Sequence, residues 1–174
     1  MIIWLNGTFG AGKTTTSEGL IKTLPDSRIF DSEDVGHMLR PVLSSVQVSD
    51  FQQWTPWRGL VVETAARVLD YVGGTLVIPQ TVLVETYWQE IRSGLEQAGI
   101  PVHHFVLHAD HDTLVNRIEN DTLLPGVRRW RLDHLTAYQN ALPWLEREAE
   151  VIDTSQLTPD QVTEQIRSSV AKPA

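Results

Sequence analysis

The stretch WLNGTFGAGKTTTSEGL, residues 4–20, decides the fold of this chain. Its first residues continue an apolar run that predicts a buried strand, and its last residues predict a helix. Between them, Gly7, Gly12, Lys13 and Thr14 fit the pattern G-x-x-x-x-G-K-[ST], the P-loop or Walker A motif. A strand before the motif and a helix after it are the context that this motif requires, so the stretch predicts a phosphate-binding loop.

Each residue type in the loop has a physical task. Glycines let successive N–H groups point at phosphate oxygens, and the helix N-terminus adds the positive end of its dipole. Lys13 supplies a compact charge to the β- and γ-phosphates, and the Thr14 hydroxyl suits Mg²⁺, a cation that prefers oxygen ligands. The plain alternative is a glycine-rich turn without a ligand. We expect ATP to be held by Gly7, Thr8, Phe9, Gly10, Ala11, Gly12, Lys13, Thr14 and Thr15, with Thr14 also a ligand of Mg²⁺.

Composition excludes several other classes of protein. The chain has 174 residues, a length that fits one domain, residues 1–174, with a full core. Its net charge of −8 argues against nucleic acid as a partner, and the absence of cysteine fits a cytoplasmic location. The apolar run at residues 2–5 is too short for a secretory leader, and no segment approaches the roughly 20 apolar residues of a transmembrane helix.

Apolar runs alternate with amphipathic stretches along the whole chain, which predicts an α/β fold. We expect a five-stranded parallel sheet with helices on both faces, like that of nucleoside and shikimate kinases. Residues 44–54 predict an irregular surface segment, and residues 121–127 predict a loop. The expected strands cover residues 1–6, 28–31, 75–79, 101–109 and 150–155, and the expected helices cover residues 13–24, 32–43, 55–72, 86–99, 111–120, 128–148 and 158–171.

Asp31 is the carboxylate best placed for catalysis. The third expected strand is followed by Gln80 and no carboxylate, which argues against a motor or switch GTPase. Asp31 follows the second strand, at the sheet edge where ligands of parallel sheets bind. It could accept a proton from a substrate hydroxyl or hold Mg²⁺ through water. The alternative is a helix cap formed with Asp34, and one residue can do both.

Further residues could bind an acceptor on the same side of the sheet. Arg40 could grip an anionic or polyhydroxyl group, or remain an exposed charge near a helix C-terminus. Trp57 and Arg58 open a long helix, where an aromatic ring and an arginine suit a pocket, although Trp57 could equally fill the core. Gln80 ends the third strand and should point at the shared cleft.

Arginines surround the expected loop at residues 121–127. A mobile lid around residues 119–131 could bring arginines to a transferring phosphoryl group, whose charge they would neutralise. We favour Arg117 or Arg128 as that catalytic arginine. Solvated helix charges paired with local carboxylates are the alternative. Residues 153–156 follow the last strand and should lie near the adenine, by their position alone.

Histidines gather in one part of the chain but do not predict a metal site. Alternation along a strand puts His103 on the face opposite His104 and His108, whereas zinc requires ligands that converge. We interpret these residues, and His111 beside them, as structural.

The chain resembles the tunicamycin-resistance protein family of P-loop proteins. The resemblance rests on MIIWLNGTFGAGKTTT, FDSEDVGHMLR, DFQQWTPWRG and LVIPQTVLVETYWQEI…GIPVHHFVLHA, and it fades beyond residue 120. The family is similar in fold to chloramphenicol phosphotransferase and small-molecule kinases. The resemblance implies ATP binding and resistance to a nucleoside antibiotic. Membrane contact through a C-terminal tail, which relatives can carry, has no support in SSVAKPA.

Three functions remain open at this point. The first is an ATP-dependent phosphotransferase that modifies tunicamycin or a related nucleoside or sugar. The second is a protein that sequesters the drug, with ATP only shaping the pocket. The third is a housekeeping sugar or nucleoside kinase, for which resistance is incidental.

Overall fold

The computed structural model describes residues 1–121 and 125–171. Strands and helices alternate along the chain, as the hydrophobic pattern predicts, and two short 3-10 helices lie in the segments expected to be irregular or loop. The elements are β1 (Ile2–Asn6), α1 (Lys13–Thr23), β2 (Ser27–Ile29), α2 (Glu33–Val42), η1 (Phe51–Gln53), α3 (Thr55–Val72), β3 (Thr75–Pro79), α4 (Glu85–Gln97), β4 (Val102–His108), α5 (His111–Glu119), η2 (Pro125–Val127), α6 (Arg128–Glu148), β5 (Glu150–Asp153) and α7 (Pro159–Val170).

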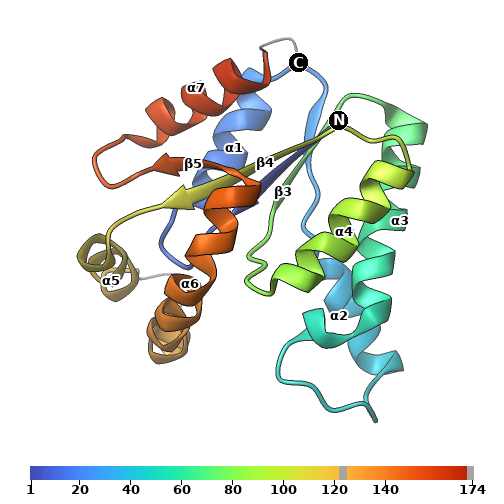
Figure 1. Cartoon of the computed structure of the whole chain (residues 1–174), viewed down its shortest axis with the longest axis horizontal. Coiled ribbons are helices and arrows are strands. Elements are labelled where there is room, and N and C mark those ends of the chain that lie inside the picture. Colours follow the sequence, from blue (N-terminus) through green and yellow to red (C-terminus); the bar gives the residue numbers. More distant parts are fainter. Residues whose placement is uncertain (122–124, 172–174) are drawn as a thin grey trace.

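The strands form a five-stranded parallel sheet in the order β2-β3-β1-β4-β5, so the predicted fold class is confirmed. Helices α1 and α7 pack together on one face of the sheet, and α3, α4 and α6 cover the other (Figure 1). With both faces covered, β1 is buried at every position, which explains its continuous apolar run. The central place of β1 puts the loop that follows it in the middle of the sheet edge.

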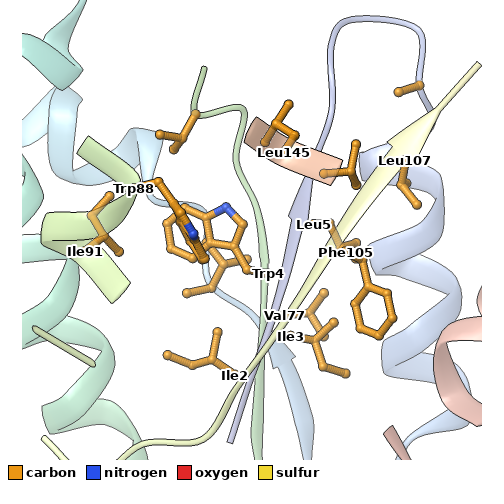
Figure 2. Close-up of a cluster of buried hydrophobic side chains, with 14 of the residues drawn as sticks. Ile2, Ile3, Trp4, Leu5, Val77, Trp88, Ile91, Phe105, Leu107 and Leu145 are labelled. Atoms are coloured by element: carbon orange, nitrogen blue, oxygen red, sulfur yellow. The ribbon is translucent and has the colours of Figure 1, made fainter. Parts of the chain in front are cut away.

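The core divides between the two faces of the sheet. Figure 2 shows Trp4 against Trp88 of α4, with ring centroids 5.2 Å apart, while Phe105 points to the opposite face. This division follows from strand alternation, because successive side chains of a strand point to opposite faces. Both tryptophans are fully buried, and together they hold α4 against the centre of the sheet.

Most helix boundaries agree with the local signals in the sequence. Thr158 caps α7 through a capping box with Gln161, as the Thr-Pro start predicts. At α3, Trp54 takes the cap position and Thr55 is already helical. Pro143 lies inside α6 without ending it.

Candidate nucleotide and acceptor site

The loop between β1 and α1 has the backbone of a phosphate cradle. Gly7, Gly10 and Gly12 have φ values of 129°, 76° and 96°, a region that L side chains rarely adopt. A Cβ on Gly7 would lie 2.4 Å from the backbone oxygen of Leu107, so an alanine there would force the loop off β4. No atom lies within 4 Å of a Cβ placed on Gly12, which begins α1, so this side of the loop is open to a ligand.

Lys13 is folded back onto the loop. Its Nζ donates to the carbonyl oxygens of Gly7 and Thr8, at 2.9 and 3.0 Å. Burial lowers the pKa of Lys13 to about 8, which the carboxylate of Glu33 partly offsets and the guanidinium of Arg131 reinforces. Two carbonyl dipoles are a weak substitute for an anion, so this ammonium group is poised to move onto a phosphate.

The residues of the loop fit a nucleotide phosphate and its metal ion. The Oγ1 of Thr8 is buried and has no hydrogen-bond partner within the described parts of the chain. Thr14 is exposed in the first turn of α1 and lines a cavity beside the loop, where its hydroxyl can reach an ion. Backbone N–H groups, an ammonium and free hydroxyls are the donor set that Mg-ATP requires.

The cavity beside the loop has a volume of about 890 Å³ and lies at the carboxyl ends of β2 and β3. Lys13 and Thr14 form its wall on the side of the loop. Asp31 and Glu33 line it after β2, so the position expected for Asp31 is the observed one. The phosphate cradle therefore shares one space with carboxylates, as transfer between two ligands requires.

Asp31 and Glu33 differ in what surrounds them. The Oδ1 of Asp31 accepts the backbone N–H of Glu33 at 2.9 Å, so Asp31 also stabilises the start of α2, where Ser32 makes no capping bond. Partial burial raises the pKa of Glu33, and the neighbouring charge of Asp31 raises it further. A carboxyl with a raised pKa is suited to take up a proton.

Gln80 and Thr81, which follow β3, connect the start of α2 to the phosphate loop. Gln80 is almost completely buried, and its Oε1 accepts the hydroxyl of Ser32 at 2.7 Å. The hydroxyl of Thr81 donates to the carbonyl oxygen of Gly7 at 2.7 Å. Gln80 lines the cavity as expected, and so does Arg40, which is exposed near the end of α2.

Trp57 and Arg58 do not line the cavity, contrary to their predicted place in an acceptor pocket. Trp57 is fully buried, and its Nε1 donates to the carbonyl oxygen of Ser32 at 2.9 Å. Arg58 is 7% exposed, pairs with Glu90 of α4, and lies over the ring of Tyr87 at 4.2 Å. The first turn of α3 is sandwiched between α2 and α4, so these side chains support the cavity wall from behind.

We call the cavity lining outside the phosphate loop the acceptor wall. Its largest part comes from residues 44–54, which we expected to be an irregular surface segment. Arg58 donates to the carbonyl oxygen of Gln52, and Gln52 Nε2 donates to that of Thr81 at 2.9 Å. Phe51 packs on Gly36 of α2, where a Cβ would lie 2.9 Å from its ring. Polar and apolar side chains follow one another here without a regular period. The sequence pattern therefore did not indicate that they share a surface. The residues of this segment that line the cavity are Ser44, Val46, Gln47, Val48, Ser49, Asp50, Phe51, Gln52, Gln53 and Trp54, and Leu43 lines it just before the segment begins.

The arginines take different positions from those we expected. Arg117 donates to the carbonyl oxygen of Gly10 at 3.3 Å and to that of Thr154 at 2.7 Å, so it ties the loop to residues 153–156. Arg128 is exposed at the start of α6 and is not among the residues lining the cavity. Arg131 lines the cavity instead, with its side chain 15% exposed and paired with Asp121. Part of the expected lid, residues 122–124, lies outside the described residues.

Arg131 belongs to an aromatic cluster that joins α6 to the loop. Phe9 packs against Trp130, with ring centroids 4.9 Å apart, and the guanidinium of Arg131 lies 5.6 Å from the Phe9 ring. His134 stacks on Trp130 at 4.1 Å. The Nε of Arg131 is buried without an acceptor among residues 1–121 and 125–171. Every member of this cluster lines the cavity.

The histidines of β4 and α5 make separate contacts. His108 Nδ1 of β4 lies 2.9 Å from the hydroxyl of Tyr138, and His111, the first residue of α5, contacts Gln139 of α6. In the part of the chain that the structure describes, no group of His, Asp or Glu side chains converges as metal ligands do. The helices of the same part are all too short or too polar to cross a bilayer.

Comparison with known proteins identifies the family. A family model described as AAA domain matches residues 2–120. The structure of the tunicamycin resistance protein of Deinococcus radiodurans is 31% identical, with a TM-score of 0.73 over 99% of this chain and 96% of that one. No curated protein matched the chain.

Two kinases share the fold at low identity. A sugar kinase of Janibacter sp. HTCC2649 is 18% identical, with a TM-score of 0.69 over 97% of this chain and 93% of that one. The APS kinase CysC of Mycobacterium tuberculosis, solved with AMPPNP and APS, is 13% identical, with a TM-score of 0.60 over 98% and 97%. The likeness expected from the sequence motifs is confirmed, and the chain belongs to the tunicamycin-resistance protein family, whose fold is that of P-loop kinases.

Proposed function

We propose that this protein is an ATP-dependent phosphotransferase that confers resistance to tunicamycin. It transfers the γ-phosphate of ATP to a hydroxyl of the drug or of a related nucleoside or sugar. The observation that carries this proposal is the shared cavity, in which Lys13 of the phosphate loop faces the same space as Asp31 and Glu33. One domain, residues 1–174, would carry both halves of the site. The use of ATP and the absence of cysteine both fit a cytoplasmic location.

The loop holds the donor. Its N–H groups and the N-terminus of α1 bind the phosphates, and Lys13 leaves the Gly7 and Thr8 carbonyls to neutralise charge on the phosphate oxygens. Thr14 would hold Mg²⁺ through its hydroxyl, and the ion supplies charge neutralisation at the β- and γ-oxygens when bound. Arg131 contributes a second cation from α6, in the role that we first expected of Arg117 or Arg128.

A carboxylate after β2 receives the proton. Asp31 is the candidate from the sequence, and the raised pKa of Glu33 makes it a second candidate for the same step. The acceptor hydroxyl loses its proton to one of them as its oxygen attacks the γ-phosphorus, and ADP leaves with its electron pair on the β-phosphate oxygen. Gln80 and Arg40 line the same wall and would orient the acceptor.

Mass spectrometry of the drug tests the proposal. The protein is incubated with Mg-ATP and tunicamycin, and the drug should gain the mass of one phosphoryl group. Lys13→Ala should abolish the gain, whereas Lys22→Ala, near the end of the same helix, should leave it unchanged. A drug that keeps its mass under conditions in which the protein binds both ligands would refute transfer to tunicamycin.

Sequestration of the drug is the second candidate, and one contact favours it. Asp31 already accepts the N–H of Glu33, so its carboxylate has a structural task besides any proton transfer. A binding protein would show tight drug binding by calorimetry without turnover. Resistance would then survive Asp31→Asn and disappear in Lys13→Ala. Resistance lost in Asp31→Asn, with drug binding and folding intact, would exclude simple sequestration. A panel of acceptors with coupled detection of ADP would separate both from a housekeeping kinase.

A further inference from the structure

Asn6, the last residue of β1, uses every hydrogen-bonding group of its side chain. Its Oδ1 accepts the backbone N–H groups of Gly7 at 2.8 Å and of Val82 at 3.0 Å. Its Nδ2 donates to the carbonyl oxygen of Val82 at 2.9 Å and approaches His104 Nε2 at 3.4 Å. The residue is fully buried, and a rotated amide would set donors against donors. The amide therefore has one acceptable orientation.

His104 fixes that orientation from β4. His104 is 9% exposed, and its ring packs against that of Trp88, with centroids 3.9 Å apart. Burial lowers the pKa of His104 to about 3, so the ring is neutral at physiological pH. The Nδ1 lies 3.2 Å from the carbonyl oxygen of Glu148 and must donate to it, because that oxygen can only accept. The lone pair is thereby left on Nε2, facing the N–H₂ group of Asn6.

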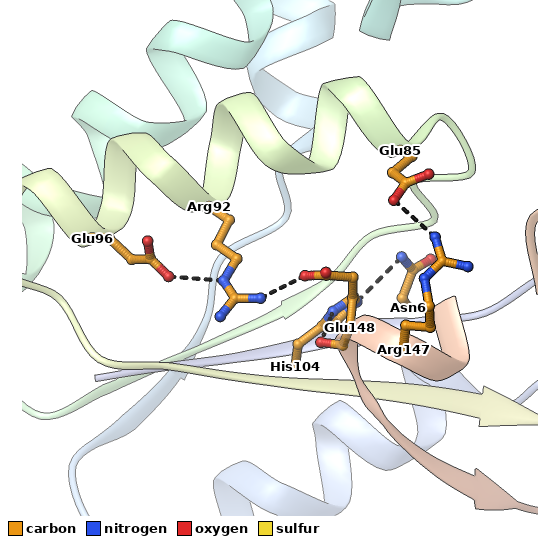
Figure 3. Close-up of polar contacts among 7 residues, drawn as sticks. All are labelled: Asn6, Glu85, Arg92, Glu96, His104, Arg147 and Glu148. Carbon is orange, nitrogen blue, oxygen red and sulfur yellow. Dashed lines mark hydrogen bonds and ion pairs between the residues drawn. The ribbon is translucent and has the colours of Figure 1, made fainter. Parts of the chain in front are cut away.

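The carbonyl that sets this tautomer is itself held in place. Figure 3 shows Glu148, the last residue of α6, paired with Arg92 of α4 at 2.6 Å. Arg92 is held by Glu96 at 2.8 Å, and Arg147 pairs with Glu85 at the other end of α4. These exposed pairs are weak individually, but they fix the end of α6 above β4. The chain of contacts runs from there through His104 and Asn6 to the first glycine of the loop.

We propose that Asn6 and His104 are positioning residues for the phosphate-binding loop. Asn6 accepts the N–H of Gly7, which belongs to the peptide between residues 6 and 7, and the Gly7 carbonyl oxygen, in the next peptide, accepts Thr81 Oγ1 and Lys13 Nζ. Loss of the Asn6 side chain leaves the N–H groups of Gly7 and Val82 without an acceptor, and the first of these peptides turns to find one. Because Gly7 joins the two peptides, such a turn also displaces the oxygen on which Lys13 rests. His104 acts only through Asn6, by presenting an acceptor to its amide.

The inference rests on the nucleotide-binding half of the proposed function and is independent of phosphoryl transfer. Its test is the affinity for AMPPNP, measured by calorimetry with Mg²⁺ well below the melting temperature of every variant. Asn6→Ala should weaken binding about tenfold or more, since it leaves two buried N–H groups without an acceptor. His104→Phe, which keeps a ring on Trp88, should weaken it about threefold to fivefold, as expected for one neutral hydrogen bond.

The double variant separates positioning from ordinary core packing. If His104 acts through Asn6, His104→Phe should change the affinity less than about twofold once Asn6 is alanine. His108→Phe is the matched control, because His108 lies on the same strand and face but contacts Tyr138. It should leave the affinity unchanged. Equal losses in both backgrounds, or melting temperatures that fall while affinities stay constant, would overturn the proposal.

Amide exchange gives a second readout that needs no nucleotide. In the protein alone, Asn6→Ala should speed hydrogen exchange at Gly7 and Val82 more than at the neighbouring amides of β1. His104→Phe should do the same to a smaller extent, and His108→Phe should not. Unchanged exchange at Gly7 in Asn6→Ala would overturn the proposal. A wild-type protein that fails to bind AMPPNP would refute the donor half of the proposed function, and exchange at Gly7 would still decide the positioning role.

Discussion

The phosphate loop and the acceptor wall form two sides of one cavity, but they are built in different ways. The loop is local: residues 7–15 carry it, and in our proposal its backbone N–H groups and one lysine bind the phosphates. The wall combines α2, the segment of residues 43–54, the end of β3 and the first turns of α6. Backbone N–H groups are the donors of a phosphate-binding loop, so the sequence motif of such a loop has a fixed spacing. The side chains that we propose for the acceptor come from separate parts of the chain, and only tertiary packing brings them together.

The largest expected effect is on catalysis, and it would show whether the acceptor wall holds the base. Asp31→Asn and Glu33→Gln should be compared in kcat. We expect one of them to lower kcat by roughly 10²–10⁴-fold, the usual contribution of a general base. Neither should change the affinity for AMPPNP by more than about twofold, because neither contacts the loop by a hydrogen bond. Kinetics at saturating substrate make the measurement. If both variants keep the full kcat, neither Asp31 nor Glu33 is the general base.

The next effect separates the loop from the wall by charge. Lys13→Ala should weaken Mg-ATP binding by roughly 100-fold, since a charged hydrogen bond contributes up to about 3 kcal/mol. Acceptor binding in the absence of nucleotide should change little. Lys22→Ala removes a lysine near the end of α1 and is the control. Calorimetry with each ligand alone measures both affinities. An equal loss for the two ligands would contradict the division into two halves.

A smaller effect is expected from a glycine behind the acceptor wall. A Cβ on Gly36 would lie 2.9 Å from the ring of Phe51, so Gly36→Ala should push η1 into the cavity. We expect the KM for the acceptor to rise about tenfold, since small misplacements cost at least this much, while the KM for ATP stays unchanged. Gly59→Ala is the matched control, because nothing lies within 4 Å of a Cβ there. A shift in both KM values would show that the wall and the loop move together.

The pH dependence of ATP binding should follow Lys13. Its pKa is about 8 in the free protein, and a bound phosphate raises it, so protonated Lys13 favours binding. Affinity should therefore fall as the pH rises through 8, by at most about tenfold per unit. Between pH 8 and 10.5 the unfolded chain binds more protons at this lysine, so its contribution to the free energy of unfolding rises with pH. Lys13→Arg, which stays charged, should flatten the binding profile. If the affinity of the wild-type protein for ATP does not fall above pH 8, Lys13 is not the group that sets this pH dependence.

These contrasts explain which parts of the molecule the sequence could predict. The strands, the helices and the loop depend on periodicity, caps and glycine spacing, which are local. Asp31 was predictable because it ends a strand at the ligand edge. Trp57 and Arg58 were misplaced because a helix start next to a site can face either the cavity or the core. Arg131 was not preferred to Arg117 and Arg128, because its burial against Phe9 depends on tertiary packing.

A crystal structure with AMPPNP and tunicamycin bound would test the central claim most directly. Our account predicts that Lys13 leaves the Gly7 carbonyl for the γ-phosphate. It also predicts that a drug hydroxyl lies between that phosphate and Asp31 or Glu33, with residues 43–54 against the drug. A drug bound outside this cavity, such as in the groove between α1 and α7, would contradict the account. So would a drug inside the cavity with every hydroxyl out of reach of both carboxylates.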